Sequence, residues 1–79
     1  MIVRYFAAAR AAAGGLSSET ISATTLGQMN RVLAARHGER LAAVLASSSF
    51  LVDSTACHDP HRPLPAGAVV DVLPPFAGG

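Results

Sequence analysis

The sequence contains no lysine and no tryptophan, and its only cysteine is Cys57. Without a lysine, the chain offers neither a Schiff-base amine nor the lysine of a phosphate-binding loop. A single cysteine excludes an internal disulfide framework and favours a reducing, cytoplasmic compartment. No apolar run is long enough to span a bilayer, and the first residues lack the pattern of a signal peptide. We therefore expect neither secretion nor a membrane segment.

Charge is also scarce, because only 14% of the residues are charged and the formal net charge is +1. The six basic residues are all arginines and are scattered, so no basic stripe is available for a nucleic-acid backbone. Apolar residues, in contrast, make up 51% of the 79 residues. That content favours a compact fold over disorder, and the length predicts a single domain over residues 1–79.

The order of periodic segments predicts the class of fold. Four stretches have the alternation or β-branched content of strands, namely residues 2–7, 19–22, 50–52 and 69–73. Three others have helical composition and period, namely residues 8–13, 26–37 and 39–46. This order predicts an α+β fold with one main helix packed on a mixed sheet of four to five strands. The first and last strands should lie side by side in the middle of that sheet.

The main helix has clear boundaries in the sequence. Thr25 and Gln28 have the spacing of a capping box, in which each side chain satisfies a free backbone N–H of the other residue. Leu26, Met29 and Leu33 then fall on one face, which we interpret as core rather than as a cofactor site. The helix should end at a glycine, residue 38.

The densest group of metal-type ligands is Cys57-His58-Asp59-Pro60-His61. Structural zinc sites usually bring their ligands as two separated pairs, and no second pair occurs in this chain. We therefore interpret the stretch as an exposed polar loop and expect no metal site. A cysteine nucleophile also needs a base that a third group orients, which adjacent loop residues rarely achieve.

The end of the chain is the most unusual segment, and it reads Leu73-Pro74-Pro75-Phe76-Ala77-Gly78-Gly79. Two consecutive prolines favour an extended polyproline conformation, in which the last six residues could reach about 20 Å into a partner. Phe76 supplies an apolar anchor. Gly78 and Gly79 have no Cβ, so the backbone and its carboxylate can pass through a narrow channel. We expect a protruding tail over residues 74–79.

Several motifs resemble those of a known family. Phe6-Ala7-Ala8-Ala9-Arg10 is followed four residues later by Gly14, Leu64 is followed by Gly67, and the chain finishes on the Pro-Pro-Phe-Ala-Gly-Gly segment. Over essentially its whole length the chain resembles the MoaD/ThiS sulfur carriers, which are ubiquitin-like β-grasp proteins, and most closely the small subunit of molybdopterin synthase. It departs from their pattern at Ala11, Asp53 and Ala68, and none of these departures affects the terminal carboxylate.

The resemblance implies that the chain is a carrier subunit rather than an enzyme, with the Gly79 carboxylate as its reacting group. A ubiquitin-activating-type, MoeB-like enzyme would adenylate this carboxylate with ATP, and a sulfurtransferase would help convert it to a thiocarboxylate. The sulfur would then pass to precursor Z inside a MoaE-like large subunit, in a hetero-oligomer with two copies of each subunit. Pro74, Pro75, Phe76, Ala77 and Gly78 would contact the partners. No bound cofactor is implied, because ATP is used by the activating enzyme.

Three other functions stay open from the residues. The same activated carboxyl could deliver sulfur to thiamine, cysteine or tRNA thiolation, or could serve protein conjugation. A third possibility is a ubiquitin-like binding module that docks without covalent chemistry.

Overall fold

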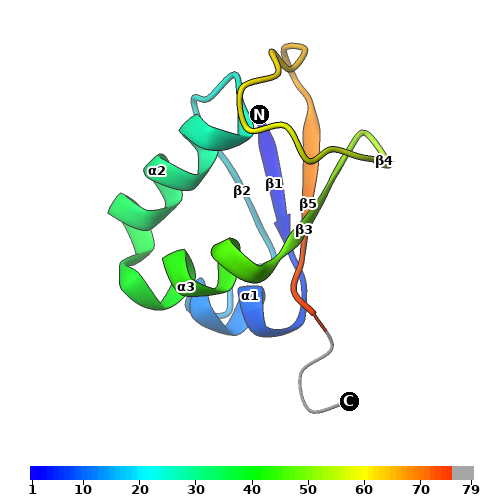
Figure 1. Ribbon diagram of the computed structural model, residues 1–79. Helices are drawn as coiled ribbons and strands as arrows, with labels where there is room; N and C mark the ends of the chain where they lie inside the picture. The colour runs from blue at the N-terminus through cyan, green and yellow to red at the C-terminus, as the bar shows by residue number, and fades with distance from the viewer. Residues whose placement is uncertain (76–79) are drawn as a thin grey trace.

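A mixed five-stranded sheet organises the molecule, and its strands lie in the order β2-β1-β5-β3-β4. The computed structural model describes residues 1–75. The strands are β1 (Ile2–Tyr5), β2 (Ser18–Thr20), β3 (Ser49–Val52), β4 (Thr55–Ala56) and β5 (Val69–Leu73). The helices are α1 (Ala7–Ala12), α2 (Leu26–His37) and α3 (Glu39–Ser47). Figure 1 shows the arrangement of these elements.

The centre of the sheet is the pair formed by the first and last strands, as predicted. β1 runs parallel to β5 and antiparallel to β2, while β3 runs antiparallel to both β5 and β4. β5 is rich in valine and is buried along most of its length, as expected for a strand with a neighbour on each side. The short strand β4 was not predicted, because two residues carry no detectable periodicity. It follows a tight turn at Asp53 and Ser54, which both have positive φ.

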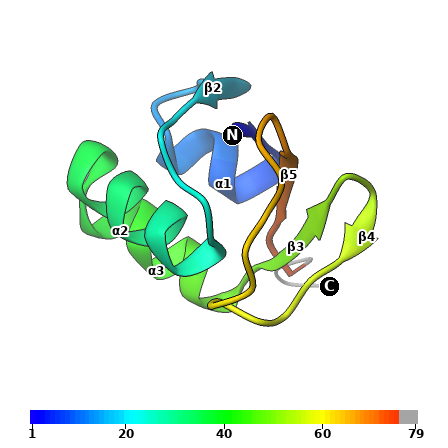
Figure 2. The ribbon, with the colours of Figure 1, turned by 90° about the horizontal axis from the view of Figure 1, so that it is seen from above.

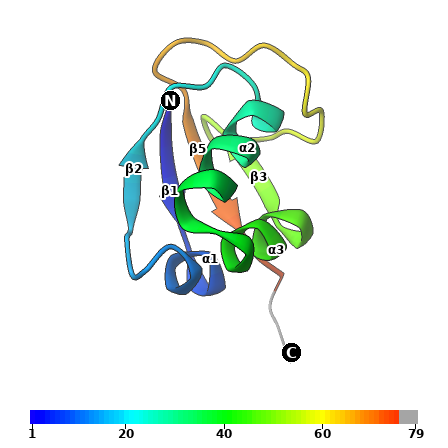
Figure 3. The same ribbon diagram turned by 90° about the vertical axis from the view of Figure 1, so that its left-hand side faces the viewer.

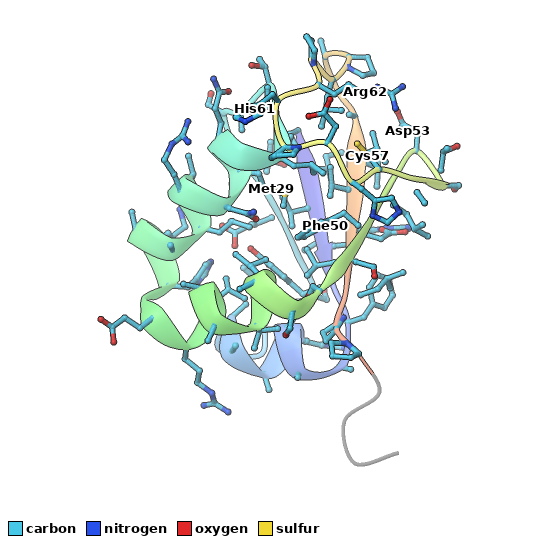
Figure 4. The ribbon with its side chains drawn as sticks, in the orientation of Figure 1. Met29, Phe50, Asp53, Cys57, His61 and Arg62 are labelled. Carbon is cyan, nitrogen blue, oxygen red and sulfur yellow. The ribbon has the colours of Figure 1, made fainter. Side chains whose placement is uncertain are left out.

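The helices cover one face of the sheet, as Figures 2 and 3 show. The predicted stripe of α2 is buried, and Met29 points from this helix toward the sheet (Figure 4). α3 adds a second buried edge beside α2, through Leu41 and Leu45. The largest side chains with almost no exposed surface form the middle of this core: Met29, Leu33, Leu41, Val3, Val70 and Val72. None of the helices in residues 1–75 is long and apolar enough to cross a membrane.

The start of α2 differs in one detail from the predicted capping box. The hydroxyl of Thr25 accepts a hydrogen bond from the backbone N–H of Gln28 at 3.1 Å, as expected. The side-chain oxygen of Gln28, however, accepts from the backbone N–H and the hydroxyl of Thr24, at 2.8 and 2.9 Å. The second half of the box is therefore shifted by one residue. At the other end, Gly38 has φ of +88° and forms the junction between α2 and α3, a conformation that favours glycine.

The stretch from Cys57 to His61 is only partly the exposed loop that the sequence predicted. Cys57 is 3% exposed and belongs to the hydrophobic core, between the loop and the sheet (Figure 4). The backbone N–H of Cys57 donates to the carbonyl of Phe50, which draws the start of the loop inward. His58 and His61 are exposed. Within residues 1–75, no group of three or more histidine, cysteine or acidic side chains is arranged to hold a metal ion.

Candidate functional site at the root of the C-terminal segment

The chain leaves the sheet at a place that the strand register determines. Val72 of β5 lies beside Tyr5 of β1 in the parallel pair, so both strands end at the same edge of the molecule. Pro74 follows the last strand residue and has no N–H to continue the ladder. Pro74 is half-buried and Pro75 is exposed. The C-terminal segment thus starts next to α1, at the end of the central strand (Figure 1).

An apolar hollow of about 410 Å³ lies at this root and is lined by Phe6, Ala7, Leu73 and Pro74. Phe6 is 41% exposed, and it is one of only three large hydrophobic side chains in the described chain that are exposed to this extent. A second hollow of about 330 Å³ includes Phe6 and Ala7 and extends to Arg10, Ser17 and Ser18. An exposed aromatic ring between two hollows is typical of a contact surface rather than of a core.

Phe6 continues the alternation of β1, in which Val3 and Tyr5 are buried and Arg4 is exposed, and a sharp bend follows it. Phe6 is still extended, with φ of −125° and ψ of 148°, and Ala7 then takes φ of +49° at the start of α1. A positive φ at a residue with a Cβ costs about 1 kcal/mol or more. The bend turns the chain from β1 into α1, and the exposed ring of Phe6 lines the hollow together with Leu73 and Pro74.

An ion pair joins the two central strands close to this root. The guanidinium of Arg4 donates from Nε to Oδ1 of Asp71 at 2.5 Å and from Nη2 to Oδ2 at 2.8 Å. Asp71 is 7% exposed, and Arg4 also lies 6.0 Å from the centre of the Phe6 ring. The hydrogen bond to Asp71 and its negative charge raise the pKa of Arg4, so the guanidinium stays charged at neutral pH. A buried carboxylate needs such a bidentate partner.

A second polar cluster lies on the helical side of β1. Glu19 of β2 accepts hydrogen bonds from the Tyr5 hydroxyl and from the Arg36 guanidinium, both at 2.6 Å. Nε2 of His37 lies 2.5 Å from the same carboxylate, whose side chain is 10% exposed. The cluster therefore connects β1, β2 and the last turn of α2.

The electrostatics of this cluster indicate a structural role. Burial raises the pKa of Glu19, but the hydrogen bonds from Tyr5, Arg36 and His37 lower it by more, and the net shift is downward. Burial, and then the hydrogen bond to Glu19, raise the pKa of the Tyr5 phenol. Both shifts move the pKa values of these groups further from neutral pH. The cluster therefore holds β2 and the end of α2 against β1.

The predicted site residues fall partly inside and partly outside the described chain. Pro74 and Pro75 lie at the root, where the sequence placed the start of the tail. Phe76, Ala77, Gly78 and Gly79 lie outside the described residues, so their assigned roles stay predictions. The sequence interpretation missed the Arg4–Asp71 pair. The sequence contained an indication of this pair, because Arg4 and Asp71 are each the one charged residue of an apolar strand. The parallel register then brings the two side chains together.

Comparison with known proteins shows the family of this chain. The sequence model of the ThiS family matches residues 3–79. The chain belongs to the ThiS family. A comparison with curated proteins found no match.

Solved structures similar to this ThiS-family chain share its fold. One is a chain in the complex of subunits 1 and 2 of molybdopterin-converting factor from Helicobacter pylori, with 24% identity and a TM-score of 0.72, covering 99% of this chain and 96% of that one. A second is the HVO 2177 protein of Haloferax volcanii, with 26% identity and a TM-score of 0.75, covering 99% and 84%. A third is SAMP1 of Haloferax volcanii, with 20% identity and a TM-score of 0.75, covering 99% and 97%.

These matches confirm the resemblance to the MoaD/ThiS sulfur carriers and the ubiquitin-like fold. Proteins of this family are small carrier subunits. Within this fold the hollow of about 410 Å³ has only apolar residues among its described lining, and it lies at the point where the C-terminal segment begins.

Proposed function

We propose that this chain is the sulfur carrier of a molybdopterin synthase, in which it acts as the small subunit. The observation that carries the proposal is the position of Pro74 and Pro75 at the end of the central strand, in a ThiS-family chain that continues to Gly78-Gly79. A strand held on both sides gives the tail a rigid base. The similar fold in a two-subunit molybdopterin-converting factor supports a MoaE-like large subunit as the partner.

The proposed chemistry starts at the Gly79 carboxylate, which is a poor acyl donor because its charge is delocalised over both oxygens. A MoeB-like adenylating enzyme joins it to the α-phosphate of ATP, releasing pyrophosphate and forming an acyl-adenylate. The outer sulfur of a sulfurtransferase persulfide then attacks the acyl carbon and displaces AMP. A second thiol attacks the resulting acyl disulfide, forms a disulfide with the sulfurtransferase cysteine and releases the Gly79 thiocarboxylate.

The thiocarboxylate then enters the large subunit and donates its sulfur to precursor Z, and two such donations complete the dithiolene that later binds molybdenum. The large subunit supplies the catalytic groups, since this chain has no lysine and its described root offers no acid or base. In this proposal the chain is a cosubstrate, binds no cofactor of its own, and works in the cytoplasm in an assembly with two copies of each subunit.

Intact-mass spectrometry tests the first half of the proposal. The full chain is incubated with the adenylating enzyme, ATP, a sulfurtransferase and a sulfur donor. A gain of about 16 Da is expected, which is the mass difference between sulfur and oxygen. The matched control lacks Gly79, and it should show no gain although its circular dichroism and thermal unfolding are unchanged. Absence of the mass gain in the full chain with active enzymes contradicts the carrier role.

A second assay tests the pathway. The thiocarboxylated chain is mixed with a MoaE-like large subunit and precursor Z, and formation of the dithiolene product is followed by chromatography. Conversion supports the molybdopterin role. A thiocarboxylate that forms but does not convert precursor Z contradicts this pathway. That result would favour sulfur delivery to thiamine synthesis, cysteine synthesis or tRNA thiolation.

A further inference from the structure

The helical layer contains a groove that the proposed sulfur chemistry does not use. The groove has a volume of about 300 Å³ and lies between α2 and α3. Its lining residues are Asn30, Arg31, Ala34, Ala42, Leu45 and Ala46. None of them lines the hollows at the root of the C-terminal segment. A partner on this groove would therefore contact a different part of the molecule from one that holds the tail.

The floor of the groove is apolar, and the small size of its alanine side chains leaves the space between the helices open. Ala34, Ala42 and Ala46 stand where larger side chains would close the space between the two helices. Asn30 lies at one side, and its Oδ1 is buried without a hydrogen-bond partner among the described residues. A buried acceptor without a partner costs about 1–3 kcal/mol. A ligand that donates a hydrogen bond to this oxygen would recover that free energy on binding.

The rim of the groove carries a positive charge. Arg31 is exposed and forms no ion pair with any residue in 1–75, whereas Arg4 and Arg36 are paired with Asp71 and Glu19. No acidic residue lines the groove. Charge complementarity therefore favours a ligand that brings a carboxylate next to an apolar group.

We propose that the groove between α2 and α3 docks a protein segment that presents an aliphatic side chain next to a carboxylate. The aliphatic side chain fills the hollow over the three alanines, and the carboxylate pairs with Arg31. A backbone N–H in the first turn of a helical segment, which has no partner inside that helix, donates to the Asn30 carboxamide, and this group can turn about its last bond to meet it. One arginine above an apolar floor does not suit a nucleic-acid backbone, which needs several cations in a row.

The test uses the full chain labelled with ¹⁵N and two acetylated, amidated helical peptides, followed by NMR titration. One peptide carries leucine and glutamate one helical turn apart, and the other has glutamine in place of glutamate. We expect shifts at the groove residues, with a dissociation constant of about 1 mM for the acidic peptide and about fivefold weaker binding of the neutral one. The Arg31→Gln variant should remove this preference, while Arg40→Gln, on an exposed arginine of α3, should keep it.

A second pair of variants tests the hollow itself. Ala46→Glu places a carboxylate in the groove and should abolish the shifts. Ala43→Glu adds the same charge at an exposed position of the same helix that does not line the groove, and should leave most of the affinity. Amide spectra that keep their dispersion show that each variant is folded.

Shifts that lie outside the groove, equal binding of both peptides, or no binding would each overturn the proposal. The titration involves no sulfur transfer, so its result is independent of the proposed function.

Discussion

Replacement of Glu19 by glutamine should be the most informative single change in the polar cluster behind β1. The carboxylate accepts hydrogen bonds from Tyr5 and Arg36 and contacts His37, and its side chain is 10% exposed. Glutamine keeps the shape but removes the charge and one of the two acceptor oxygens. Hydrogen bonds to a charged group contribute about 1.5–3 kcal/mol, so we expect Glu19→Gln to lower the free energy of unfolding by about 2 kcal/mol. For a chain of this size, that lowers Tm by about 8–16 °C.

The effect should also depend on pH in a defined direction. The pKa of Glu19 in the folded chain is lowered from its ordinary value of 4.5. A carboxylate with a lowered pKa contributes its full stabilisation when the pH is above its pKa in the unfolded chain. That contribution is lost as the pH falls through its pKa in the folded chain. The difference between the original chain and Glu19→Gln should therefore be full at pH 7 and shrink once the pH falls below 4.5.

Urea unfolding followed by circular dichroism at several pH values measures both effects. Glu39→Gln is the matched control, because Glu39 is exposed in the first turn of α3, and it should change stability by no more than about 0.5 kcal/mol. Tyr5→Phe removes one donor and should cost about 1 kcal/mol. If Glu19→Gln is as stable as the original chain at pH 7, or if the difference grows on acidification, the assigned role of the cluster is wrong.

Three further changes test the rest of the fold by the same unfolding measurement. Leu33→Ala removes a side chain with 0% exposure from the core and should cost about 3 kcal/mol, and a cost below about 1 would contradict its central position. Thr25→Ala removes the acceptor that caps α2 and should cost about 1 kcal/mol, while an unchanged stability would show that the cap is dispensable. Ser54→Gly relieves a φ of +70° in the turn between β3 and β4 and should stabilise the chain by about 0.5–1 kcal/mol. Destabilisation by this glycine would refute the turn geometry.

The fold was predictable where the signal is local and periodic. The apolar spacing of Leu26, Met29 and Leu33 placed the main helix, and the run of valines around Asp71 placed the central strand with its bounds. Features that depend on distant neighbours were not predictable. Cys57 is buried in the core, and its N–H donates to the carbonyl of Phe50, a contact that nothing within the loop sequence reveals.

The candidate site shows the same division. Pro74 ends the last strand for a reason visible in one residue, since proline lacks the N–H that a ladder needs. The bend after Phe6 depends on the positive φ of Ala7, and the sequence around it looks like a continued strand. The Arg4–Asp71 pair exists only because the parallel register aligns two residues that are far apart in the chain. Local sequence patterns therefore predicted where the C-terminal segment begins. The residues that surround this point are brought there by tertiary structure and were not predicted.

The parallel pairing of β1 and β5 has a practical consequence for labelling. Because both strands run in the same direction, Met1 lies at the opposite end of the sheet from Pro74, separated by more than the length of β1, which is about 13 Å for four residues (Figure 1). The sequence has no lysine, so the amine of Met1, which donates to the carbonyl of Ile21, is the only amine that an acylating dye can modify. A fluorophore attached through this chemistry reports from a single known point and leaves the root of the C-terminal segment unobstructed.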